Sequence, residues 1–156
     1  MRPGKTLAIL AIAASIVTAA CSKDDNNSPQ NAEAILTTNR WQLTAATITI
    51  PGSSLSVNVY DSVPACARDN FYSFAAGGTV TIDEGASKCD PSDAQTTTGN
   101  WQLLNSNTQI KTVDPLTGES TTANIVTLSS SKLVLQDTAT YSGFKVTANI
   151  TLTNVK

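Results

Sequence analysis

The stretch FKVTANITLT, residues 144–153, alternates apolar and polar side chains over its whole length. A strand places successive side chains on opposite faces, so this alternation predicts a strand with one dry face and one wet face. At helical spacing the same apolar residues would scatter around the cylinder and form no single face. The residues expected on the dry face are Phe144, Val146, Ala148, Ile150 and Leu152.

Shorter runs of the same kind occur upstream and are separated by turn residues such as Pro51-Gly52 and Ala76-Gly77-Gly78. The first run changes phase after Ala45, which indicates a β-bulge within that strand. About nine strands with a turn signal roughly every ten residues are typical of an antiparallel all-β sandwich or barrel. One short helix is expected, at residues 31–38. The other strands are expected at residues 41–50, 55–59, 71–75, 79–83, 99–103, 110–113, 125–128 and 133–136.

The first twenty residues have the order of a secretory signal peptide, with Arg2 and Lys5 ahead of an apolar run from Thr6 to Ala20. As a helix this run would be about 22 Å long, which is short for a hydrocarbon core of about 30 Å. No other apolar run in the sequence approaches that length. We therefore expect cleavage after residue 20 and a mature chain without a transmembrane helix.

The apolar run stops at Cys21 in IVTAACSKDDNN, residues 16–27, and polar residues follow at once. This stretch resembles the lipobox of bacterial lipoproteins, which implies acyl chains on Cys21 that would anchor the protein firmly. Residues 21–30 predict a flexible tether. Lys23-Asp24-Asp25 resembles a signal of Bacteroidota surface lipoproteins, so we expect the outer membrane, and its external face rather than the periplasmic one. The alternatives are a plain signal peptide with a chance cysteine, and an ordinary solvated linker.

Charge and composition narrow the possible partners and chemistry. The chain has 10 basic and 12 acidic side chains, and loss of Arg2 and Lys5 with the signal leaves 8 against 12, a balance of −4. Nucleic acid is excluded as a partner because no cluster of Lys and Arg is present to neutralise phosphates. The sequence contains no histidine, which removes the commonest general base and the commonest metal ligand.

Catalytic motifs are also absent from the sequence. There is no Gly-x-Ser-x-Gly elbow, and the adjacent Asp83 and Glu84 would point to opposite faces of a strand. We therefore predict a non-enzymatic protein without cofactor or metal. The acidic loop at residues 83–93 is expected to be solvated, with calcium binding as the less favoured alternative. Cys66 and Cys89 are best interpreted as a disulfide in an oxidising compartment; the alternative, a zinc site, would need two more soft ligands.

Three segments resemble one known family: NRWQLTAATI from residue 39, ARDNFYSFAAGGTVTIDEGASKCDPSD from residue 67 and TGNWQLLNSNTQI from residue 98. They are similar to the lipocalin-like domain of Bacteroidota lipoproteins, and the similarity covers residues 37–156. It implies a small up-and-down β-barrel of lipocalin or calycin type, of about eight to nine strands, over residues 31–156 and with a Cys66–Cys89 disulfide. Many lipocalins carry Gly-x-Trp on the first strand, where this chain has Asn39-Arg40-Trp41. The residues that carry the similarity are Trp41, Cys66, Asp69, Phe74, Gly78-Thr79, Cys89 and Gly99-Asn100-Trp101.

Aromatic residues are the candidates for a ligand pocket in such a barrel. An eight-stranded barrel is just wide enough either to be filled by side chains or to hold one small ligand. Filling is the commoner outcome, and Tyr72 and Tyr141 are the expected exceptions. We hypothesise either binding of a small apolar molecule, lipid or glycan, or a protein-interaction or inhibitory module with a packed interior. The candidate ligand-binding residues are Trp41, Tyr72, Phe74, Trp101 and Tyr141.

Overall fold

The computed structural model describes residues 31–114, 117–141 and 143–155. The predicted signal peptide, the lipid-attachment residue Cys21 and the tether at residues 21–30 lie outside the described residues. Within the described part of the chain, none of the helices combines the length and the apolar character needed to cross a bilayer.

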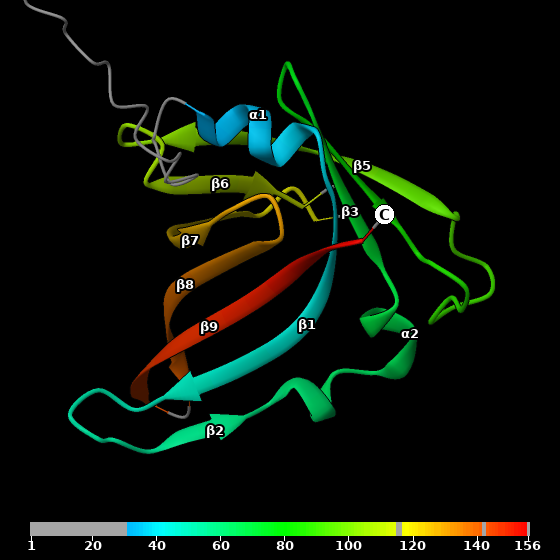
Figure 1. The fold of residues 1–156 in the computed structure, drawn as a ribbon. Helices are drawn as coiled ribbons and strands as arrows, with labels where there is room; N and C mark the ends of the chain where they lie inside the picture. Colours follow the sequence, from blue (N-terminus) through cyan, green and yellow to red (C-terminus); the bar gives the residue numbers. More distant parts are fainter. Residues whose placement is uncertain (1–30, 115–116, 142, 156) are drawn as a thin grey trace, which may run out of the picture.

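The described chain consists mainly of antiparallel strands with a few short helical elements (Figure 1). Every predicted strand is present, although the strands expected at residues 99–103, 125–128 and 133–136 are longer than predicted, and the sequence pattern did not indicate the two short helical elements at residues 60–62 and 65–68. The helical elements are α1 (Ala32–Thr37), the 3₁₀ turn η2 (Tyr60–Ser62) and α2 (Ala65–Arg68). The strands are β1 (Arg40–Thr49), β2 (Ser56–Asn58), β3 (Phe71–Ala75), β4 (Thr79–Asp83), β5 (Thr96–Leu104), β6 (Gln109–Val113), β7 (Ser120–Leu128), β8 (Lys132–Tyr141) and β9 (Phe144–Val155).

Eight of the strands form a closed barrel. β1 pairs with β9 from Arg40 opposite Val155 to Thr49 opposite Thr147, and so joins the last strand to the first. The first part of β1 also pairs with β3, whereas its last part pairs with β2. From β3 to β9, each strand is the antiparallel partner of the next along the chain. The predicted up-and-down barrel is therefore confirmed, and β2 is an extra strand beside β1.

Local backbone features follow from particular residues. The phase change predicted in β1 is a register shift between Leu43 and Ala45 opposite β9. A second shift lies between Ile125 and Thr127 in β7. The turn at residues 105–107 has positive φ values of 51°, 56° and 67°, and asparagine at two of these positions tolerates this conformation better than most residues do.

One end of the barrel, which we call the closed end, is covered by α1 directly before β1 (Figure 1). Ala32, Ile35 and Leu36 follow the i, i+3, i+4 spacing of one helix face, and all three are buried. The fully buried indole of Trp41 donates a hydrogen bond from Nε1 to the Leu36 carbonyl oxygen at 3.2 Å. This contact fixes the helix against the first strand.

The same end holds large hydrophobic side chains from the strands. The Phe74 and Trp101 rings meet edge to face with their centroids 5.2 Å apart. The Trp101 indole donates from Nε1 to the Ala75 carbonyl oxygen at 3.1 Å, so its polar group is satisfied although the residue is buried. Full burial of such side chains stabilises a fold by about 1.5–3 kcal/mol each. This closed-end core also contains Val80, Ile110, Leu128, Leu133 and Leu152.

Candidate ligand-binding site

The opposite end of the barrel, which we call the open end, is where β4, β6 and β8 finish and β5, β7 and β9 begin. Two adjoining cavities of about 330 and 300 Å³ occupy the barrel interior toward this end. Their walls share Thr112, Thr121, Leu135 and Ile150. The first is also lined by Leu43, Tyr72, Phe74, Val80, Ile82 and Asp114, and the second by Ala123, Asp137 and Ala148.

The cavities exist because the inward side chains become smaller toward the open end. Inward positions of β6, β7 and β9 carry threonine or alanine, which cannot fill a space that Trp and Phe fill at the closed end. Ile150 is 40 % exposed because it faces this unfilled space, and Phe144, at the start of β9, is 68 % exposed. The predicted dry face is therefore wrong for these two residues, whereas Val146 and Leu152 are buried as expected.

Polar side chains interrupt the apolar walls at a few places, chiefly through two threonines and two aspartates. Asp114 belongs to the turn after β6, where its Oδ1 accepts hydrogen bonds from the Thr117 N–H at 2.8 Å and the Thr117 hydroxyl at 3.1 Å. Asp137 lies within β8, and its Oδ1 accepts a hydrogen bond from the Thr138 N–H at 2.7 Å. Among the described wall residues there is neither lysine nor arginine. The charged groups of the wall are therefore carboxylates.

Tyr72 brings an aromatic hydroxyl to the wall of the larger cavity. Burial raises the pKa of this phenol above its ordinary value, and the negative charge of Glu84 raises it further. The phenol is therefore neutral at physiological pH and can donate a hydrogen bond to a ligand.

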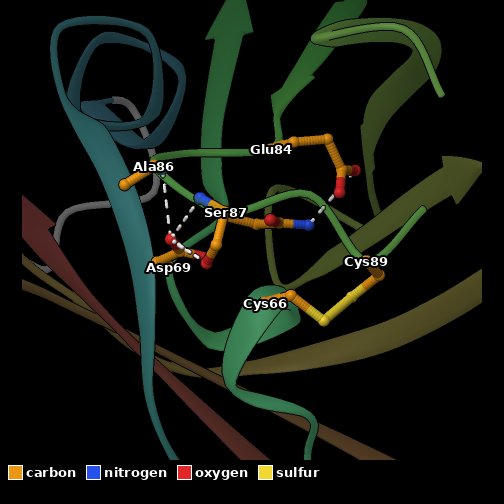
Figure 2. The surroundings of a disulfide bond; sticks show 7 residues. Cys66, Asp69, Glu84, Ala86, Ser87 and Cys89 are labelled. Carbon is orange, nitrogen blue, oxygen red and sulfur yellow. Dashed lines mark hydrogen bonds between the residues drawn. A yellow bond between two sulfur atoms is a disulfide. The ribbon is translucent and has the colours of Figure 1, made fainter. Parts of the chain in front are cut away.

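A disulfide braces one side of the open end (Figure 2). It joins Cys66 in α2 to Cys89 in the β4–β5 loop with an S–S distance of 2.01 Å, as the sequence predicted. Beside it, Asp69 Oδ2 accepts hydrogen bonds from the Ala86 N–H at 3.1 Å and from the Ser87 N–H and hydroxyl at 3.0 and 2.8 Å. The Ser87 hydroxyl is the largest cause of a lowered pKa at the Asp69 carboxyl.

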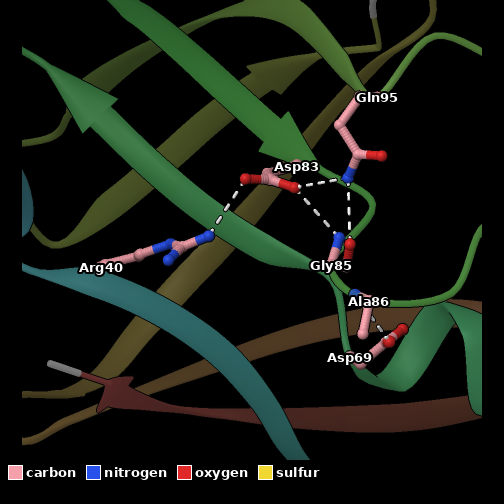
Figure 3. Close-up of polar contacts among 6 residues, drawn as sticks. All are labelled: Arg40, Asp69, Asp83, Gly85, Ala86 and Gln95. Carbon is pink, nitrogen blue, oxygen red and sulfur yellow. Dashed lines mark hydrogen bonds and ion pairs between the residues drawn. The ribbon is translucent and has the colours of Figure 1, made fainter.

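A second set of polar contacts holds the beginning of the same loop (Figure 3). Asp83, at the end of β4, accepts hydrogen bonds from Gln95 Nε2 at 2.9 Å and the Gly85 N–H at 3.0 Å. It also forms an ion pair with Arg40 of β1 at 3.0 Å. These contacts, the Gln95 bond first, lower the pKa of the Asp83 carboxyl. Gly85 has a φ of +69°, and a Cβ there would lie 2.3 Å from the Asp69 carbonyl oxygen, so only glycine fits.

Carboxylates of the acidic loop at residues 83–93 therefore accept hydrogen bonds from nearby groups of the same chain. Asp90 follows the same rule, because its Oδ1 accepts hydrogen bonds from the Ser92 N–H at 2.9 Å and the Ser92 hydroxyl at 2.7 Å. Across the described residues, no group of three or more cysteine, aspartate or glutamate side chains is arranged to hold a metal ion. Calcium binding, the less favoured alternative for this loop, has no support in its geometry.

The aromatic residues predicted to bind a ligand lie in different parts of the barrel. Tyr72 and Phe74 line the larger cavity. Trp41 and Trp101 belong to the closed-end core and line neither of the two cavities, whereas Phe74 belongs both to that core and to the cavity wall. Tyr141 is the last residue of β8 and pairs with Phe144, and its side chain is not among those that the structure describes. The interior is therefore packed around the two tryptophans, as the packed-interior interpretation expected. It is not packed in the open half, where the cavities lie.

Most of the cavity wall is aliphatic, whereas the residues predicted to bind a ligand are all aromatic. Leu43, Ile82 and Leu135 occupy inward positions of β1, β4 and β8. Asp137 follows Leu133 and Leu135 at alternate positions of β8, so a charged residue occupies a face of the strand that is otherwise apolar up to that point. That interruption is a signal in the sequence that could have identified Asp137.

Comparison with protein families matches residues 37–135 to the family described as "Lipocalin-like domain". None of the curated proteins compared with the chain matches it. The matched range covers more than half of the 156 residues and runs from α1 into β8, and the closed antiparallel barrel agrees with it. This chain therefore belongs to the lipocalin-like family.

Proposed function

We propose that this protein binds a small apolar molecule inside its barrel and that it does so as a lipoprotein of the outer membrane. The observation that carries the proposal is the pair of adjoining cavities, of about 330 and 300 Å³, toward the open end. Ligand pockets in proteins typically have volumes of about 300–1,000 Å³ and mostly apolar walls with a few polar groups. The walls of these cavities have that composition.

An apolar molecule or a lipid chain suits these walls better than a glycan does. Leu43, Ile82 and Leu135 provide hydrocarbon surface, whereas the buried hydroxyl groups of a sugar would each need a hydrogen-bond partner. Proteins of the lipocalin-like family generally bind ligands without catalysis, which supports a non-enzymatic role. The alternative, an interaction or inhibitory module, assumed a packed interior, and the cavities count against that assumption.

Membrane anchoring is the part of the proposal that rests on the sequence around Cys21. The first described residues lead into α1 at the closed end, so a tether from Cys21 would join the barrel opposite its open end. Cys21→Ala should move the protein from the membrane fraction to the soluble fraction of its host; a variant that still sediments with membranes would contradict the anchor without affecting the cavity.

The binding proposal is tested by filling the cavity. Ala148→Phe places an aromatic ring inside the smaller cavity, next to the shared wall residue Ile150. Ala34→Phe makes the same change on the exposed face of α1 and is the matched control. Binding is measured as the fluorescence increase of N-phenyl-1-naphthylamine, a neutral apolar probe, with far-ultraviolet circular dichroism as the check on folding.

We expect the wild type and Ala34→Phe to bind the probe with the same affinity and Ala148→Phe to bind it much more weakly. Equal binding by all three proteins would place the probe outside the cavity and would overturn the proposal. So would a folded wild type that binds neither this probe nor 1-decanol, measured by calorimetry.

A further inference from the structure

We propose that the ligand of this cavity is an apolar molecule with a positively charged group, such as an alkyl amine, and that Asp137 receives that group. This inference rests on the proposed function and adds the charge of the ligand to it. The juxtaposition that carries it is a carboxylate on the wall of a mostly apolar cavity, with open space beside it.

The space beside Asp137 follows from the strand register. Its direct partner on β9 is Ala148, and both residues line the smaller cavity together with Ala123 of β7. Alanine side chains end at Cβ, so they leave room at the carboxylate for a ligand group. Among the described residues, the Asp137 side chain accepts a hydrogen bond at Oδ1 from the Thr138 N–H and forms no ion pair.

The cations of the described chain are engaged elsewhere or lie on the outer face of the barrel. Arg40 pairs with Asp83 and stacks over the Phe71 ring, and Lys88 donates a hydrogen bond to the Asp93 carbonyl oxygen.

The Arg68 guanidinium lies 5.4 Å from the centre of the Tyr60 ring. Lys111, Lys132 and Lys145 alternate with inward residues of β6, β8 and β9, which places their side chains outside the barrel. The wall of the cavity therefore receives no cation from these six residues.

The physical consequence is a cavity that selects by charge. A cationic ligand group that enters the cavity can hydrogen-bond to the Asp137 carboxylate, and a charge-assisted hydrogen bond of this kind is stronger than one between neutral groups. An anionic ligand such as a fatty acid would meet Asp137 and, on the wall of the larger cavity, Asp114. Like charges at short range are unfavourable, so fatty acids should bind worst although their chains fit equally well.

The experiment compares three probes with the same ten-carbon chain: decylamine, 1-decanol and decanoate. Each displaces N-phenyl-1-naphthylamine at neutral pH and below the concentration at which it forms micelles. In the wild type, decylamine should bind about tenfold more tightly than decanol, which corresponds to one charge-assisted hydrogen bond, and decanoate should bind most weakly.

Three variants assign the preference to one side chain. Asp137→Asn should remove the advantage of decylamine over decanol and leave the affinity for decanol unchanged, whereas Asp137→Glu should retain the preference. Glu33→Gln removes the same unit of negative charge from the exposed face of α1 at the closed end and should behave as the wild type.

The outcomes separate this inference from the proposed function. Equal affinities for decylamine and decanol in the wild type would overturn the charge preference while leaving the cavity as a binding site. Equal loss of the preference in Asp137→Asn and Glu33→Gln would show that overall charge, not Asp137, attracts the amine. If none of the three probes displaces the fluorophore, the proposed function itself is wrong.

Discussion

The closed and open ends of the barrel are made by the same strands, but they differ in how completely side chains fill the space between those strands. At the closed end, α1 and the large aromatic residues exclude solvent, and Trp41 is 0 % exposed. At the open end the inward residues are smaller, and Ile150 remains 40 % exposed. Both ends occur on β9 itself, because Leu152, two residues beyond Ile150, is part of the closed-end core.

This difference separates the sources of stability from the site of binding. Burial of apolar surface stabilises a fold roughly in proportion to the area removed from water, so the closed end contributes more to stability than the open end does. The unfilled open half gives up part of that stabilisation and retains space for a ligand. Its rim is instead held by the Cys66–Cys89 disulfide and by carboxylates such as Asp69 and Asp83.

The largest effect is expected from a change at the closed end. Trp41→Ala removes a fully buried indole and its hydrogen bond to Leu36, and should lower the free energy of unfolding in urea by about 3–5 kcal/mol. At the open end, Ile150→Ala removes a side chain that is already partly exposed, so its cost should be about 1 kcal/mol or less. Equal losses for the two variants would contradict the comparison of the two ends.

The next effect concerns the disulfide at the open end. Replacing Cys66 and Cys89 together by alanine opens a loop whose ends are 23 residues apart. Chain-entropy arithmetic gives a loss of about 3 kcal/mol in the free energy of unfolding. Neither cysteine is among the wall residues of the two cavities, so the folded double variant should bind the apolar probe with the wild-type Kd. Loss of binding in a variant that remains folded would show that the disulfide also shapes the cavity.

The smallest effect compares two glycines of the open end. Gly85 and Gly118 have similar positive φ values, +69° and +73°, so alanine strains the backbone equally at both. A Cβ at Gly85 would lie 2.3 Å from the Asp69 carbonyl oxygen, whereas one at Gly118 would meet nothing within 4 Å. Overpacking should therefore make Gly85→Ala less stable than Gly118→Ala by about 1–3 kcal/mol in thermal denaturation. Identical melting temperatures would indicate that the loop moves away from Asp69 without cost.

Much of the fold could be predicted because alternation and turn chemistry are local properties. The hairpin of β3 and β4, with Gly77 and Gly78 in its turn, has the predicted bounds, and the bulge in β1 lies within two residues of its expected place. The few residues of η2 and α2 carry no periodicity, so pattern alone could not indicate them. The position of α2 depends instead on distant contacts, among them the disulfide at Cys66.

The candidate site could be predicted only in part. Tyr72 and Phe74 were identified as aromatic residues of a barrel, and the structure places both at the larger cavity. The same reasoning also selected Trp41 and Trp101, which lie in the closed-end core. Alternation along a strand shows which side chains point inward, but it does not show at which end of the barrel they lie. Asp137 was not predicted because the expected strand ended at residue 136, whereas β8 continues through Asp137 to Tyr141.

The sequence by itself determined that this chain forms antiparallel strands with one apolar face, because side-chain alternation is read directly from neighbouring residues. It also indicated a disulfide between Cys66 and Cys89, the two cysteines that remain if Cys21 carries lipid as predicted. Only the tertiary structure decided which apolar residues pack and which line a cavity. That outcome depends on the summed volume of side chains brought together from strands far apart in the chain, and on where α1 covers the barrel.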